Sequence, residues 1–101
     1  MTGRVSLTAS DVRVLRALAT AVDTPSVSGL RRAAVPVWDV LEGLGLSDLA
    51  VTLQRVPSDV RRALWAMRDA GLVEITPRSW WSITPAGRAA LADADRGDGP
   101  R

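Results

Sequence analysis

The sequence predicts a mainly α-helical domain with one small β-hairpin, an α+β fold class. Apolar residues recur at helical spacing over 8–22 and again over 58–71. The period then changes to two over 73–83, as in paired strands. Glycine and proline separate these stretches, so each is expected to form its own element.

Length and composition favour a single globular domain. The 101 residues suffice for one modest core, and 47% of them are apolar. We expect one domain over 8–94, a flexible lead over 1–7, and a disordered tail over 95–101 that is rich in glycine and charge. No apolar run approaches the roughly 18 residues of a membrane span, and no signal-peptide core is evident. A cytoplasmic protein that does not enter the membrane is therefore expected.

The chain lacks the residues most used for catalysis and metal binding. It has no cysteine and no histidine, which excludes disulfides, soft metal ligands and the commonest general base. The two glutamates, Glu42 and Glu74, are isolated, and no glycine-rich phosphate loop precedes a helix. We expect no enzyme, no metal and no cofactor.

The first helix is expected over 8–22. Thr8 and Asp11 have capping-box spacing. The apolar residues cover an arc of about 160°, wider than the roughly 100° that a single contact requires. Two interpretations stay open: a helix deep inside its own domain, or one that also forms a dimer seam. The residues of the arc are Val12, Val14, Leu15, Leu18, Ala19 and Val22.

Residues 23–45 are the least regular part. Asp23-Thr24-Pro25-Ser26 predicts a break, and Ser28–Ala34 predicts one or two helical turns carrying Arg31 and Arg32. A helix follows over Val37–Leu44, with Pro36 in its first turn, Trp38 in or near the core, and Gly43 and Gly45 ending it.

A short helix and a turn come next. Ser47 is expected to cap this helix, and Leu49, Ala50 and Leu53 are expected to form its inward stripe. Ala50 is small enough for a close helix crossing. Residues 54–57 form the turn, with Val56 as its buried contact.

The helix over 58–71 has two distinct faces. Ser58 or Asp59 is expected to cap it, and Gly71 to end it in a left-handed conformation. Its inward face holds Val60, Ala63, Leu64, Met67 and Ala70, and its outward face holds Arg61, Arg62, Trp65, Arg68 and Asp69.

The hairpin and a last helix complete the domain. Residues 76–79 supply the turn, Trp81 and Ile83 are expected to point inward, and Trp80 outward. Thr84 is expected to cap a final helix that Pro85 begins, and Gly87 to permit close packing; these assignments follow from residue type and position.

A family resemblance rests on residues 46–87. The string SDLAVTLQRVPSDVRRALWAMRDAGLVE, followed by WWSITPAGRAAL, resembles the winged helix-turn-helix of small bacterial and phage transcriptional regulators, including the MarR-like and PadR-like groups. The likeness covers about 42 of 101 residues and is specific for architecture rather than subfamily. In that family a minimal link joins the first two helices. Two alternatives follow. Either residues 26–43 are an insertion, or the helix over 37–44 is the true first helix and 8–22 is an N-terminal extension; the second is favoured.

The resemblance implies double-stranded DNA as the partner. Helix 58–71 would enter the major groove, where Ser58, Arg61 and Arg62 would meet base edges or flanking phosphates. Arg55 in the turn would contact phosphate, and Arg78 at the wing tip a phosphate or the minor groove. Trp65 either packs at the edge of the core, lines a protein interface, or stacks with Arg61.

The functional expectation is a sequence-specific DNA-binding regulator that acts as a homodimer on two half-sites. All 13 basic residues are arginine, in a composition typical of GC-rich coding, and the net charge is only +2. The low charge and the tryptophans Trp65 and Trp80 keep open a protein-interaction module of a phage or bacterial assembly. An architectural or excision-type DNA binder is a further alternative. The sequence indicates no target site, effector ligand, or choice between activator and repressor.

Overall fold

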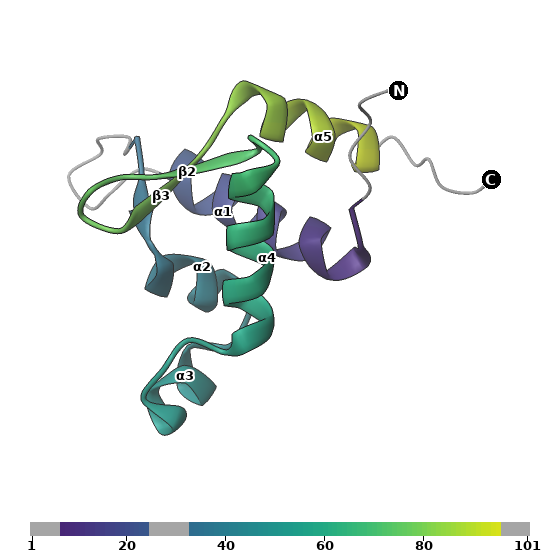
Figure 1. Ribbon diagram of the computed structural model, residues 1–101. Coiled ribbons are helices and arrows are strands. Elements are labelled where there is room, and N and C mark those ends of the chain that lie inside the picture. The colour runs from purple at the N-terminus through teal and green to yellow at the C-terminus, as the bar shows by residue number, and fades with distance from the viewer. Residues whose placement is uncertain (1–6, 25–32, 96–101) are drawn as a thin grey trace.

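The computed structural model describes residues 7–24 and 33–95, and within them it confirms an α-rich fold with a small antiparallel sheet (Figure 1). The elements in chain order are α1 (Ala9–Asp23), β1 (Val35–Pro36), α2 (Val37–Gly43), α3 (Ser47–Leu53), α4 (Ser58–Asp69), β2 (Val73–Ile75), β3 (Trp80–Ile83) and α5 (Pro85–Asp95). None of the helices in these two ranges has the length and apolarity needed to cross a bilayer.

The sheet has three strands in the order β1-β3-β2, all antiparallel. The β2–β3 hairpin confirms the expectation from the period of two, with Trp81 buried and Trp80 exposed. Strand β1 was not expected; its Val35 lies opposite Trp81. The helical turns expected over 28–34 are wrong at their described end, because Ala33 and Ala34 are not helical. The rest of that segment, including Arg31 and Arg32, lies outside the described residues.

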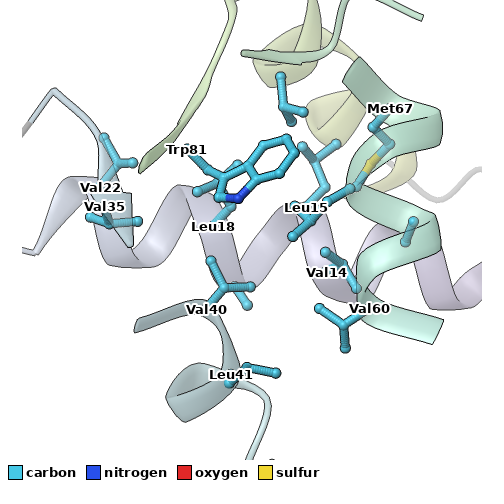
Figure 2. Close-up of a cluster of buried hydrophobic side chains, with 14 of the residues drawn as sticks. Val14, Leu15, Leu18, Val22, Val35, Val40, Leu41, Val60, Met67 and Trp81 are labelled. Carbon is cyan, nitrogen blue, oxygen red and sulfur yellow. The ribbon is translucent and has the colours of Figure 1, made fainter. Parts of the chain in front are cut away.

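The core is organised around α1, which packs against α2, α4, α5 and β3. Figure 2 shows Trp81 over α1, with apolar side chains entering from α2 and α4. The wide apolar arc of α1 is therefore covered by the chain's own elements, as in the first interpretation above. Helix α1 lies at the centre of this cluster and is part of the core. The buried residues of α1 are Val14, Leu15, Ala17, Leu18, Ala19 and Val22.

A capping box begins α1, as expected. The Asp11 N–H donates to Thr8 Oγ1 at 3.0 Å, and the Thr8 N–H donates to Asp11 Oδ2 at 3.2 Å. These two bonds satisfy N–H groups that the helix itself leaves free.

The side-chain caps expected for α3 and α4 are wrong. Leu46 and Pro57 occupy the N-cap positions, and neither makes a side-chain cap hydrogen bond. Ser47 and Ser58 are the first helical residues, one position beyond the place from which a side chain reaches the free N–H groups. At the other end of α4, Gly71 has φ +81°, which confirms the left-handed stop.

Helix α3 is placed differently from the expectation. Ala50 is fully buried, but Leu49 and Leu53 are 46% and 44% exposed, so the inward stripe is wrong. Helix α3 lies against α2 and projects away from the rest of the molecule (Figure 1). Trp38 in α2 is also exposed, at 46%, and does not belong to the core. Val56 in the following turn is half-buried against the core.

Helix α5 is anchored at its start and along its length. The Thr84 hydroxyl accepts from the Gly87 N–H at 3.0 Å, which confirms the expected cap. A Cβ at Gly87 would lie 2.1 Å from the Leu72 carbonyl oxygen, so the close packing is confirmed as well. Arg88 binds Asp23 through both guanidinium amines, and this hydrogen bonding raises the pKa of Arg88.

Candidate nucleic-acid interface

The outward face of α4 is exposed, and its inward face is buried as the sequence predicts. Val60, Ala63, Leu64 and Met67 are at most 5% exposed. Only Ala70, which follows the helix as its C-cap, departs from the expected inward set and is exposed. The helix thus presents one side to the core and the other to solvent. The sequence-predicted site residues Ser58, Arg61, Arg62 and Trp65 all lie on the solvent side.

Arg61 and Arg62 have no ion pair with any described residue. The salt bridges within the described residues involve other arginines: Arg16 with Asp95, Arg68 with Asp69, and Arg88 with Asp23. A guanidinium group that is not engaged internally keeps all five N–H donors for an outside acceptor. Arg61 and Arg62 are consecutive residues near the start of α4, so two exposed guanidinium groups lie at that end of the helix.

Arg55 lies in the turn that leads into α4 and is exposed. The turn is shaped by Gln54 at φ +57° and by the Arg55 N–H, which donates to the Ala50 carbonyl oxygen at 3.1 Å. A third cation is therefore held close in sequence to the N-terminus of α4. The positive end of the helix dipole adds to its attraction for anions.

Trp65 packs at the edge of the core, as one of the three interpretations had it. Its ring meets the Trp81 ring edge to face, with centroids 5.3 Å apart and an interplanar angle of 81°. Its cation partner is Arg68, whose guanidinium carbon lies 5.2 Å from the ring centroid, and not Arg61. Trp65 remains 41% exposed. It therefore joins α4 to the hairpin while presenting an aromatic edge to solvent.

The hairpin turn is stiffened by Thr76. The Thr76 N–H donates to the Trp80 carbonyl oxygen at 2.8 Å, and Thr76 Oγ1 accepts from the N–H groups of Arg78 and Trp80, both at 3.2 Å. Pro77 fits the second position of the turn, and Ser79 is left-handed at φ +66°. Arg78 is exposed at the tip of this turn.

The site residues form two groups. Arg55, Ser58, Arg61, Arg62 and Trp65 belong to α4 and the turn before it, whereas Arg78 lies at the end of a hairpin that extends sideways from the C-terminal end of α4 (Figure 1). Within the described residues, no hydrogen bond or salt bridge joins the Arg78 side chain to α4.

The charged residues of α1 and α5 form a different surface. A shallow groove between these helices contains Arg16, Asp23, Arg88 and Asp95, which are paired with one another. Sequence reasoning missed these pairs because the partners are far apart along the chain. Among the described residues, no group of three or more His, Cys, Asp or Glu could hold a metal ion.

No family model, curated protein or solved structure matches the chain.

Proposed function

We propose that this chain is a winged helix-turn-helix protein that binds double-stranded DNA in a sequence-specific manner and regulates transcription. In this proposal α4 is the recognition helix and the β2–β3 hairpin is the wing. The observation that carries it is the exposed pair Arg61 and Arg62, free of ion pairs within the described chain, on the outward face of a helix whose other face is buried.

The geometry of a duplex explains how these groups would act. The major groove accepts an α-helix, and arginine can donate two hydrogen bonds to O6 and N7 of guanine, worth roughly 1–3 kcal/mol of discrimination. Arg61 and Arg62 would supply these contacts, with Ser58 beside them. Arg55 and Arg78 would contact phosphates on either side and so fix the register of α4 without reading sequence.

A homodimer belongs to this proposal because a single small domain reads few base pairs. Two copies on half-sites about one helical turn apart, roughly 34 Å, would extend the recognised sequence. The arc of α1 is covered within the chain, so the dimer would use another surface. Sedimentation of the protein with a duplex that carries one or two half-sites measures this directly.

The test starts from a pool of random duplexes from which bound sequences are selected and then titrated at several salt concentrations. Arg61→Ala and Arg62→Ala should each weaken DNA binding. An arginine that contacts a base should also lose the preference at one base pair, and one that contacts a phosphate should reduce the slope of log affinity against log salt concentration by about 1. Arg88→Ala, which removes the same charge from α5, is the matched control and should leave the sequence preference intact. If Arg61→Ala and Arg62→Ala bind like the unaltered protein, α4 does not read DNA.

A further inference from the structure

Trp65 lies on the outward face of α4 between two arginines. At about 100° per residue, Arg61, Trp65 and Arg68 fall within about 60° of one another, so they form one stripe along the helix. Trp65 is 41% exposed, and both arginines are exposed as well. The stripe therefore offers an apolar surface between two cationic ones.

The Trp65 ring is held in place by two contacts. It meets the Trp81 ring edge to face at a centroid distance of 5.3 Å, and Trp81 is itself buried over α1 (Figure 2). The guanidinium carbon of Arg68 lies 5.2 Å from the Trp65 ring centroid. Arg68 also lies 3.6 Å from the Asp69 carboxylate, which it partly neutralises. Because the ring is already ordered, a ligand that meets it would cause little loss of side-chain entropy.

The chemistry of the major groove limits what an apolar ring can contact there. The base edges carry hydrogen-bond donors and acceptors, which suit arginine, and the C5-methyl group of thymine, which suits an apolar side chain. 5-Methylcytosine carries the same methyl group at the same position of the pyrimidine ring. The faces of the bases are stacked inside a duplex, so a side chain in the groove does not reach them. A methyl group is therefore the partner that matches Trp65.

We propose that Trp65 recognises the C5-methyl group of a pyrimidine in the major groove, either thymine or 5-methylcytosine. This inference rests on the proposed function, because it needs α4 in the groove of a duplex. Helix α4 rises by about 6 Å from Arg61 to Trp65. At roughly 3.4 Å per base-pair step, the methylated base lies about two base pairs from the group that Arg61 contacts.

The test uses the duplex that is selected from the random pool. Each thymine is replaced in turn by uracil, which removes only the methyl group, and each cytosine in turn by 5-methylcytosine, which adds one. The unaltered protein should bind about fivefold more weakly when one particular thymine loses its methyl group, the effect of one buried apolar contact. If the base in question is a cytosine, its methylation should strengthen binding about fivefold. The two arms separate the two sources of the methyl group.

Substitution of Trp65 then assigns the effect to its ring. Trp65→Ala should bind the methylated and unmethylated duplexes equally, and Trp65→Phe should keep part of the difference. Trp80→Ala removes an exposed tryptophan from β3, so it is the matched control and should keep the whole difference. Each comparison is a ratio of two affinities of one protein, so a general loss of affinity cancels. Lower salt keeps binding measurable in the weaker variants, and thermal melts check that each is folded.

Three results would overturn the inference: no methyl group alters the affinity of the unaltered protein, Trp65→Ala keeps the difference, or Trp80→Ala abolishes it. The first result, with undiminished duplex binding by Trp65→Ala, would favour a protein partner for Trp65. The proposed function is judged separately, because loss of binding in Arg61→Ala and Arg62→Ala supports it even where no methyl group matters. If the pool yields no preferred sequence, or these two variants bind like the unaltered protein, both proposals fail.

Discussion

Gly87→Ala is expected to destabilise the fold strongly, because the first turn of α5 packs directly against the backbone of Leu72. The new Cβ would lie 2.1 Å from the Leu72 carbonyl oxygen and 2.8 Å from Ile83 Cγ1. That oxygen also accepts a hydrogen bond from the Thr84 N–H at 3.0 Å and lies 2.9 Å from Thr84 Oγ1, whose single proton it shares with the Gly71 carbonyl oxygen at 2.7 Å. A shift large enough to relieve the clash would weaken both bonds.

The magnitude follows from three contributions. Overpacking costs about 1–3 kcal/mol, and two weakened hydrogen bonds cost about 1 kcal/mol each. Replacing glycine by alanine in a helix returns about 0.5–1 kcal/mol. We expect a net loss of about 3 kcal/mol, which for a domain of this size lowers the midpoint of thermal unfolding by roughly 12–24 °C.

Urea titrations and thermal melts followed by circular dichroism measure this loss. Gly43→Ala is the matched control, since its Cβ would lie 3.4 Å from Ala17 Cβ, an ordinary contact. That variant should be as stable as the unaltered chain or gain about 0.5–1 kcal/mol. If Gly87→Ala falls within about 0.5 kcal/mol of the unaltered chain, the close approach of α5 to Leu72 is wrong.

Three further predictions concern stability and can be measured in the same urea titrations. Thr8→Ala should cost about 1 kcal/mol by removing the α1 cap, and Asp11→Ala should cost less in that background than alone; additive costs would deny the reciprocal capping box. Ser79→Gly should add about 0.5 kcal/mol by relieving the left-handed backbone of the hairpin turn, and a loss would show that the Ser79 side chain matters there. Trp65→Ala should cost about 1 kcal/mol more than Trp80→Ala, because only Trp65 has an aromatic ring partner among the described residues; equal costs would argue against the Trp65–Trp81 contact.

The long elements could be predicted from the sequence because local signals and burial agree there. In α1 and α4 the helical period of apolar residues agrees with the buried set except at Val12, Ala17 and Ala70. Thr8 and Gly71 mark ends that the structure keeps. The change to a period of two located the hairpin and the inward side of Trp81. These features depend on neighbours in sequence, which a pattern can report.

The features that could not be predicted depend on contacts distant in sequence. Strand β1 has two residues, and only pairing with β3 defines it. The pattern places Leu49, Ala50 and Leu53 in one buried stripe of α3, but only Ala50 is buried. Leu49 and Leu53 stay exposed because α3 packs mainly against α2, a contact that local spacing does not report. Trp38 was assigned to the core by residue type alone, whereas its exposure follows from how α2 meets the rest of the fold.

The candidate site was predictable in part. Periodicity identified the outward direction of Arg61 and Arg62, and the structure shows them on the solvent side and without ion pairs in its described residues. Periodicity could not show that Arg16 pairs with Asp95 and Arg88 with Asp23. Nor could it show that Arg68 lies over the Trp65 ring. Tertiary contacts therefore decide which arginines are paired within the chain and which are available to a ligand.

The net charge of +2 conceals a strong internal asymmetry. Residues 33–54 carry only carboxylates, and the next stretch, 55–68, carries four arginines against one aspartate. These two described segments are neighbours in the chain and opposite in sign, and the field that they set up acts before any atom touches. A polyanion approaching from a distance would turn the molecule so that the arginines of 55–68 face it, and collisions would begin in one preferred orientation. Added salt shortens the range of the field and would remove that preference.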